Sequence, residues 1–201
     1  MSAPDIALGR PRSAEAHTAI LNAAISLTRE VGFDALAMEA VAARAGVGKA
    51  TVYRRWKTKE ALIADALDRL VRSSPVPNTG SFEDDLLTVM RGNLRMYQDP
   101  ATAALLSGLV AAMVRNPQVA AAVRNGFVEA RRNVMRQVVA RGIAAGALAT
   151  GTDIELVLDM LSGPLVYRTL ISGVRVDSRL VDVVVRAVLR GFAPDPGAVQ
   201  C

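Results

Sequence analysis

The side chains best suited to chemistry in this sequence are a run of cations between positions 44 and 59. Six Lys or Arg residues occur there without one Asp or Glu, and all three lysines of the chain are among them. Thr51, Tyr53 and Trp56 are interleaved with these cations. Cations attract phosphates and hydroxyl groups fix the register, so the pattern favours a nucleic-acid surface. A charge run taken alone is more often a solvated basic face.

Two short helices with a turn between them are predicted to position this run. Residues 38–45 are strong helix formers, with Met38, Val41 and Ala42 on one face. Gly46 suits the left-handed position after a helix end, and helical character resumes at Lys49 and continues to about residue 56. Two helices joined by a turn of about three residues that contains Gly match the DNA-binding helix-turn-helix. In that motif the N-terminal residues of the second helix enter the major groove.

Residues 17–67 resemble the DNA-binding domain of the tetracycline-repressor (TetR) family of bacterial transcription regulators. The resemblance lies in ILNAAISLTREVGF (20–33), MEAVAARAGV (38–47) and TVYRRWKTKEAL (51–62). It implies that Tyr53 and Lys59 bind phosphates, that Thr51 touches backbone or base, and that positions 49 and 54 vary with the operator. Together with the basic run, it predicts DNA contacts by Glu39, Lys49, Ala50, Thr51, Tyr53, Arg54, Arg55, Lys57 and Lys59, and by Arg12 on a basic arm.

Two positions depart from the family pattern. Ala37 stands where a Thr often caps the second helix, and Gly48 stands where a Ser often caps the third. Loss of a hydroxyl cap costs about 0.5–2 kcal/mol when Ala replaces it and only a few tenths for Gly. We therefore expect weaker operator affinity at those two contacts and no change of motif.

The whole chain reads as an all-α protein of about nine helices. A first helix is predicted from about Ser13 to Glu30 and a fourth from Lys59 to Arg72, with further helices at about 82–98, 101–115, 118–145, 153–173 and 177–191. The loop 73–80 is the predicted domain boundary. We expect a disordered basic arm (1–12), a three-helix DNA-binding domain with a connecting helix (13–72), a regulatory and dimerisation domain (81–192) and a flexible tail (193–201). For the arm, an unstructured tail without DNA contacts is the alternative.

The last two helices carry apolar stripes. In the TetR family the final two long helices form a four-helix bundle with their copies in a second subunit, and residues 160–173 resemble such a dimerising helix. The resemblance implies a homodimer that faces a palindromic operator with two recognition helices. The predicted interface residues are Leu158, Leu161, Leu165, Val166, Thr169, Leu180, Val183, Val184, Ala187 and Val188.

The family also holds a small-molecule effector between the central helices of the second domain. Methionines adapt to varied ligands, and tyrosines bring a polar tip to an apolar wall. The candidate pocket residues are Met90, Leu94, Tyr97, Leu105, Leu109, Met113, Phe127, Met135 and Tyr167, and an ordinary core is the alternative for each. Few charges are expected inside, so the predicted ligand is largely apolar; surface positions are favoured for Arg95, Arg131 and Arg168.

Composition restricts the other function classes. His17 is the only histidine and Cys201 the only cysteine, which excludes multi-histidine and cysteine-based metal sites within one chain. No phosphate-binding glycine loop occurs, so an enzyme is not expected, and neither is a cofactor. No signal peptide is visible, and the longest apolar run, residues 101–114, is too short to cross a membrane. We expect no membrane partner and a cytoplasmic location.

The sequence thus predicts a sequence-specific DNA-binding regulator, namely a repressor released from a palindromic operator by a small, largely apolar ligand. The alternatives are a non-specific DNA-binding protein and a ligand-independent regulator such as an activator. The net charge of +5 favours an anionic partner but specifies none.

Overall fold

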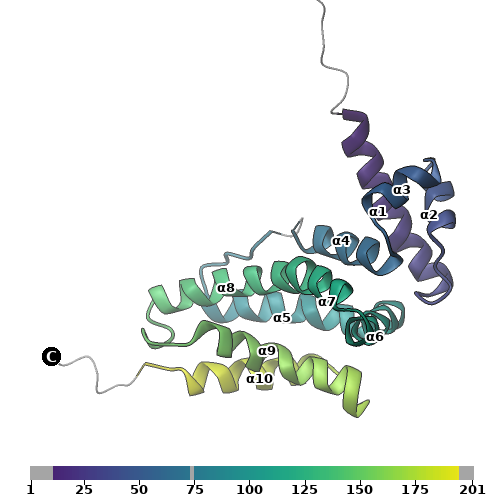
Figure 1. Cartoon of the computed structure of the whole chain (residues 1–201). Coiled ribbons are helices and arrows are strands. Elements are labelled where there is room, and N and C mark those ends of the chain that lie inside the picture. Colours follow the sequence, from purple (N-terminus) through teal and green to yellow (C-terminus); the bar gives the residue numbers. More distant parts are fainter. Residues whose placement is uncertain (1–10, 73–74, 195–201) are drawn as a thin grey trace, which may run out of the picture.

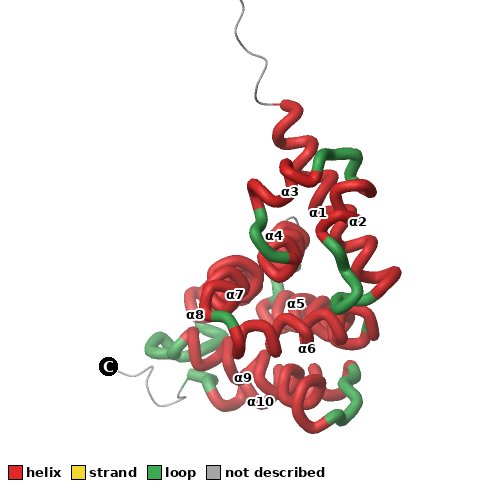
Figure 2. The backbone as a smooth tube through the Cα atoms, turned by 45° about the vertical axis from the view of Figure 1, so that its right-hand side comes forward, coloured by secondary structure: helices red, strands yellow, loops and turns green. Residues whose placement is uncertain are grey.

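The computed structural model describes residues 11–72 and 75–194, and for residues 11–13 the backbone only. All regular elements in this part of the chain are helices, which confirms the predicted all-α class (Figures 1 and 2). They are α1 (Pro11–Val31), α2 (Met38–Arg44), α3 (Lys49–Arg55), α4 (Lys59–Arg72), α5 (Phe82–Gln98), α6 (Pro100–Arg115), α7 (Pro117–Val123), η1 (Arg124–Val128), α8 (Glu129–Ala144), α9 (Ile154–Tyr167), η2 (Arg168–Ser172) and α10 (Ser178–Gly191).

The helix-turn-helix forms as the sequence predicts. Gly46 ends α2 with a φ of +67°, a left-handed conformation that a side chain disfavours. Val47 then packs against the buried core. Neither Ala37 nor Gly48, the residues that precede α2 and α3, makes a side-chain capping hydrogen bond. The two missing hydroxyl caps therefore leave the motif intact.

Side-chain caps define the helix starts in the second half of the chain. Ser81, Asp99, Asn116, Asp153 and Asp177 each accept a hydrogen bond from a backbone N–H in the first turn that follows. Such caps satisfy backbone donors that a helix leaves unpaired. Prolines occupy the first position of α6 and α7, where a missing N–H costs nothing.

Two of the long predicted helices are interrupted by π-helical turns. The segment expected as one helix at 118–145 consists of α7, η1 and α8 in continuous succession. The turn η1 lies against α4, and a Cβ at Gly126 would be 3.7 Å from the Cβ of Asp68. The last turns of the helix predicted at 153–173 are likewise η2, which ends at Gly173 with a φ of +67°. The first helix begins at Pro11, two residues before the predicted start.

The buried apolar side chains form two clusters. The first core combines α1–α4 with α6, α7 and Phe127 of η1. The second core combines α5, α8, α9 and α10. Figure 1 shows the corresponding arrangement, with α1–α3 at one end, α4 as the connection, and α9 and α10 as an outer layer below α5 and α8.

The division between the cores differs from the predicted boundary at 73–80. Leu105, Leu109 and Val123 follow that loop in sequence but pack with α1–α4. The reason is geometric, since α4 packs against α7 and η1 while α1 contacts α6. Within the described ranges, no helix has the length and apolarity required to cross a bilayer.

Candidate nucleic-acid interface

One face of α3 is open to solvent and carries the residues predicted to read DNA. Lys49, Ala50 and Arg54 are exposed, and Tyr53 lies beside them with 38% of its surface exposed. The opposite face is fixed, because Val52 is fully buried in the first core. Thr51 is half-buried, and Lys57, just after α3, is exposed. The helix thus presents a short surface of cations and hydroxyl groups of the kind that contacts phosphates and base edges.

Tyr53 and Glu39 link α3 to the first turn of α2. The Tyr53 hydroxyl donates a hydrogen bond of 3.0 Å to Oε1 of Glu39. The pKa of Glu39 is lowered, first by a hydrogen bond from its own backbone N–H and then by this phenol, and the same bond raises the pKa of Tyr53. Glu39 stays anionic and Tyr53 stays a neutral donor. In this structure the predicted phosphate-binding hydroxyl is therefore engaged by a neighbour on the same surface.

Lys59 is anchored inside the domain. Its Nζ donates to the backbone oxygens of Phe33 (2.9 Å) and Asp34 (2.8 Å) and lies 4.8 Å from the centre of the Phe33 ring. Two of the three N–H donors of this ammonium group thus hold the turn after α1 against the start of α4. The predicted phosphate contact is left to the third donor.

Two further cations of the run turn toward α1. Arg44 makes a bidentate pair with Glu30, with both N–O distances 2.8 Å, and lowers the pKa of Glu30 to about 2. Arg55 is among the predicted DNA contacts, but its Nη1 lies 3.2 Å from Nδ1 of His17 and the residue is half-buried. The arginine lies on the helix face that packs on α1, which the sequence run does not reveal.

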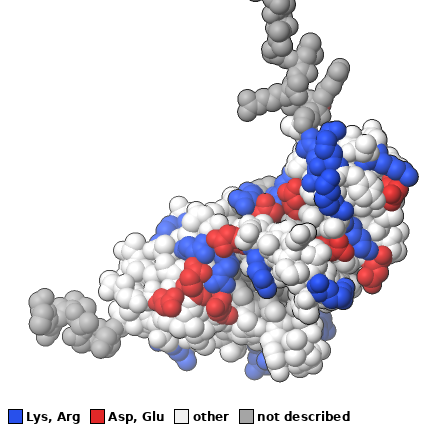
Figure 3. Space-filling model, viewed as in Figure 1, with Lys and Arg blue, Asp and Glu red and all other residues white. Residues whose placement is uncertain are grey.

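Of the predicted basic run, Lys49, Arg54 and Lys57 are exposed and form no salt bridge within the described residues, whereas Arg44 is exposed but paired with Glu30. The space-filling view shows a column of Lys and Arg at the α1–α3 end with Asp and Glu beside it, and both charge signs interleaved over the larger half (Figure 3). Arg12 lies in the first turn of α1, but its side chain and the rest of the predicted arm (1–10) are outside the described part of the chain. The exposed trio and the hydroxyl groups beside it form the candidate nucleic-acid interface.

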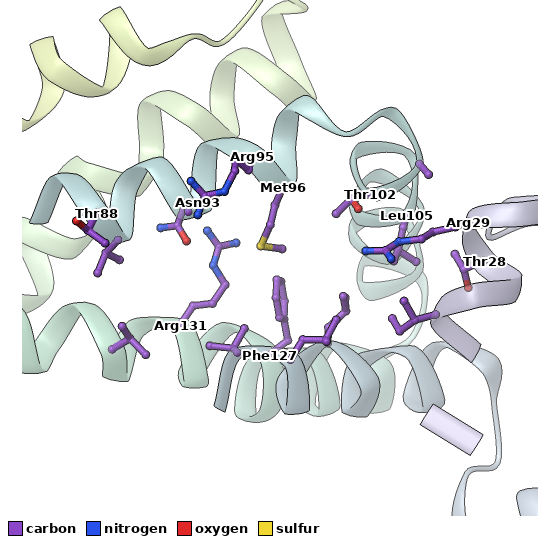
Figure 4. A pocket seen from close by; sticks show the side chains of 18 of the residues that line it. Thr28, Arg29, Thr88, Asn93, Arg95, Met96, Thr102, Leu105, Phe127 and Arg131 are labelled. Atoms are coloured by element: carbon purple, nitrogen blue, oxygen red, sulfur yellow. The ribbon is translucent and has the colours of Figure 1, made fainter. Parts of the chain in front are cut away.

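A cavity of about 460 Å³ lies between the two cores. Its walls come from α1 and α4 as well as from α5, α6, η1 and α8 (Figure 4). Of the predicted pocket residues, Leu105 and Phe127 line it. Sequence reasoning missed the α1 contribution of Ile25, Thr28 and Arg29, because it placed the pocket wholly within the second domain.

The other pocket candidates lie elsewhere. Helical spacing does not distinguish a cavity wall from a filled core, and these residues do not line the cavity. Tyr97 is half-buried next to the cavity without lining it, and Tyr167 is 60% exposed on the outside of α9. The remaining candidates pack into the first core (Leu109 and, partly buried, Met113) or the second core (Met90, Leu94 and Met135).

The predicted dimer residues also need correction. Six of the ten are buried within the single chain, in the second core, and offer a partner little surface: Leu158, Leu161, Leu165, Leu180, Val184 and Val188. Val166 and Thr169 are half-buried, while Val183 and Ala187 are exposed. The apolar stripe chosen from the sequence is the face that holds α9 and α10 against α5 and α8.

A second apolar stripe on these helices faces solvent. Leu156, Met160, Gly163 and Tyr167 follow the i, i+4, i+7, i+11 spacing of one helix face, and the exposed fractions of the three large side chains are 48%, 42% and 60%. On α10, Val183 (50% exposed) and Ala187 lie one turn apart. We call these six residues the outer face. An exposed apolar surface of this kind is typical of a protein–protein interface.

Comparisons with known proteins agree with the helix-turn-helix and with the second half. Residues 20–66 match the family model described as "Bacterial regulatory proteins, tetR family", and residues 76–188 match "Tetracyclin repressor-like, C-terminal domain". The chain is 38% identical over 185 residues to the uncharacterized HTH-type transcriptional regulator YdeS of Bacillus subtilis, covering 89% of this chain and 91% of that protein.

Two further relatives extend over nearly the whole chain. The DNA-binding transcriptional repressor TetR of Mycobacteroides abscessus is 31% identical over 198 residues, which are 96% of this chain and 99% of that protein. The crystal structure of the TetR family transcription regulator SCO0332 superposes with a TM-score of 0.81 at 28% identity, covering 90% of this chain and 100% of that one.

Proposed function

This chain belongs to the TetR family of helix-turn-helix transcriptional regulators, which are not enzymes, and from that premise we propose that it is a cytoplasmic repressor. It binds a palindromic operator as a homodimer and leaves it when a small molecule occupies the cavity. The observation that carries the proposal is the exposed face of α3, where Lys49 and Arg54 form no salt bridge with a carboxylate of the described residues.

The role proposed for this face is to read base edges in the major groove. Arg54 is suited to a bidentate contact with guanine, while Lys49 and Lys57 neutralise phosphates on either side. Thr51 and Tyr53 supply the hydroxyl groups that fix the register of the helix on the backbone. Glu39 holds Tyr53 in place from α2.

The outer face is the proposed dimer contact. An isologous contact between two copies of α9 and α10 buries the apolar side chains that a single chain exposes, including Met160 and Val183. A Cβ added at Gly163 would have no atom within 4 Å, so this place on α9 is open for the close approach of a second helix. The dimer then holds two reading heads, each formed by α1–α4 of one chain. They face successive turns of the duplex, about 34–36 Å apart or a multiple of that spacing.

Release by a ligand follows from where the cavity lies. Thr28 and Arg29 belong to α1 of the reading head, whereas Asn93 and Val134 belong to α5 and α8 of the second core. If α1–α4 take a DNA-bound and a released orientation relative to the second core, a molecule that contacts all three helices binds these orientations with different affinity. That difference is the condition for coupling ligand binding to DNA release.

The test is selection of bound fragments from a random duplex pool, with the full chain at physiological salt and excess non-specific DNA. Enrichment of a palindrome, together with a solution mass of two chains, supports the proposal. Uniform weak retention of every sequence would instead identify a non-specific DNA-binding protein, whose affinity falls with salt in the same way on all DNA. Enrichment of a single half-site without its inverted copy would contradict binding as a dimer.

A further inference from the structure

The cavity between the two cores has apolar walls with arginines at both ends. Met96 and Phe127 approach each other across its middle, and Leu105 lies beyond them (Figure 4). At one end Arg131 extends from α8 toward Asn93 and Arg95 of α5, as Figure 4 shows. No Asp or Glu is among the residues that line the cavity. A space with apolar walls and only positive charges selects a molecule with an anionic group and an apolar body.

The two arginines at that end differ from the others on their helices. Together, α5 and α8 contain six arginines. Four of these, all outside the cavity, pair with carboxylates: Arg91 with Asp182, Arg132 with Glu155 and Asp159, Arg136 with Glu129 and Glu155, and Arg141 with Asp85. Arg95 and Arg131 have no such pair among the described residues. The cations without a protein carboxylate on these helices are therefore those that line the cavity.

Arg131 is also held in position before any ligand arrives. Its Cζ lies 5.3 Å from the centre of the Phe127 ring and 5.6 Å from that of Tyr97, both within the range of cation–π contacts. Its Nη1 is 3.5 Å from the Tyr97 hydroxyl oxygen. The residue is half-buried, so water does not fully solvate the guanidinium group. Fixed, half-desolvated guanidinium groups bind carboxylate and phosphate oxygens more strongly than exposed, mobile ones do.

The opposite end of the cavity is different. Arg29 of α1 lines it close to Thr102 (Figure 4). The nearby Asp99 caps α6 and accepts hydrogen bonds from the backbone N–H (3.1 Å) and the hydroxyl group of Thr102. Asp99 partly offsets the charge of Arg29, since the arginine contributes, after Thr102, to the lowered pKa of that carboxyl. The uncompensated positive charge is therefore concentrated at Arg95 and Arg131.

We propose that the cavity binds a small amphipathic anion, with its carboxylate or phosphate group on Arg95, Arg131 and the Asn93 amide and its apolar body along Met96 and Phe127. This inference rests on the proposed function only for the consequence of binding, namely release from DNA. It revises the expectation of a largely apolar ligand, because two of the three arginines assigned to the surface by sequence, Arg95 and Arg131, line the cavity. Arg131 is half-buried there, while Arg95 is also exposed to solvent.

Binding is tested without DNA, by calorimetric titration of the full chain with ligands that share one alkyl chain. Decanoate and decyl phosphate carry an anion of each kind, decanol carries none, and decylamine carries a cation. Decanoate, decyl phosphate or both are expected to bind at least about tenfold more tightly than decanol, and decylamine is expected not to bind. Equal affinity for decanol and both anions, or no binding of either anion, would overturn the proposal.

Substitutions locate the anion within the cavity. Arg95→Gln and Arg131→Gln are each expected to weaken the preferred anion by about 10- to 100-fold, as loss of a charge-assisted hydrogen bond implies, and to leave decanol unchanged. Arg91→Gln is the matched control, since it makes the same change one turn earlier on α5 and outside the cavity. Circular dichroism and the melting temperature show whether each variant folds. The assignment would be refuted if all three variants weakened anion binding equally, or if neither cavity variant weakened it.

A last arm separates this inference from the proposed function. The preferred anion is added to the chain bound to its selected operator. Operator binding without anion binding contradicts the ligand class alone. Anion binding without release from the operator supports the ligand class and contradicts the proposed effector role.

Discussion

The two cores of this molecule join different sets of helices. The first core joins the reading head α1–α4 to α6, α7 and Phe127, so part of the regulatory half is packed as an extension of the head. The second core joins α5, α8, α9 and α10 and leaves the outer face of α9 and α10 uncovered. The cavity lies between them. The structural division therefore runs through the predicted regulatory domain, and a ligand in the cavity would contact both parts.

The largest effect is expected from the outer face of the second core. Met160→Glu places a charge in the centre of the proposed dimer contact, and the chain should become a monomer with an unchanged fold. A dimer that binds both half-sites at once typically gains a factor of about 10²–10⁴ in apparent affinity over a monomer. Operator affinity should therefore fall by about that factor. Light scattering and operator titration measure the two effects.

Val114→Glu on α6 is the matched control for this prediction. Val114 is 83% exposed and lies outside the outer face, so its replacement should leave the mass and the operator affinity unchanged. A dimer that persists in Met160→Glu and dissociates in Val114→Glu would move the interface from the second core to α6.

The next effect belongs to the reading head alone. Arg54→Ala should cost about 1–3 kcal/mol at the selected operator, the range for one bidentate base contact, and change random-DNA affinity little. Lys57→Ala, just after the end of α3, should weaken binding to operator and random DNA equally and reduce the salt slope by about one unit. Anisotropy titrations at several salt concentrations provide both numbers. If Arg54→Ala lowered the affinity for operator and random DNA equally, Arg54 would have no base-reading role.

A third substitution tests whether α6 belongs structurally to the head. A Cβ at Gly108 would lie 2.6 Å from the Phe33 ring, which itself is packed under Lys59. Gly108→Val should therefore lower the free energy of unfolding by about 1–3 kcal/mol through overpacking. Ala111→Val, exposed on the same helix, should change it by less than about 0.5 kcal/mol. Denaturant unfolding measures both, and equal effects would show that α6 and the head are not tightly packed.

The smallest effect concerns acid stability, for which each half offers one carboxylate. Glu30 pairs with Arg44 beside the first core, and Glu155 pairs with Arg136 and Arg132 beside the second. These arginines lower both pKa values from the ordinary 4.5 to about 2. The folded state binds fewer protons, so the stabilisation is complete above pH 4.5 and is lost as the pH falls toward 2.

Glu30→Gln and Glu155→Gln should each flatten the decline of stability between pH 4.5 and 2. The effects should be small and should shrink in high salt, because both glutamates are about half exposed. Unfolding curves at several pH values measure them. An unchanged pH slope in both variants would show that neither pair contributes to acid stability.

The sequence predicts most of this fold because its signals are local. Gly46, the capping Ser81 and Asp153, and the prolines at 100 and 117 each define a helix end through the geometry of a few neighbouring residues. The boundaries predicted for the recognition helix are nearly correct for the same reason. The π-helical turns are not predictable in this way, since η1 lies where the chain packs on α4 and no residue type in Arg124–Val128 demands it.

The site is harder to predict because it depends on which face of a helix packs. The residues 154–167 are apolar on two faces, and periodicity alone does not show that Leu158, Leu161 and Leu165 fill the core while Met160 and Tyr167 remain outside. Arg55 and Arg131 illustrate the same limit. Only the fold shows that one is turned to α1 and the other lines a cavity.

We propose that two copies of α3, held at a fixed separation, read one operator. The most direct measurement compares the affinity of the full chain for the selected palindrome with its affinity for the same half-sites separated by about 5 additional base pairs, half a turn of DNA. A loss of at least about 100-fold is expected, because one head then faces away from its half-site. Equal affinity for both duplexes would contradict a dimer that reads with paired recognition helices.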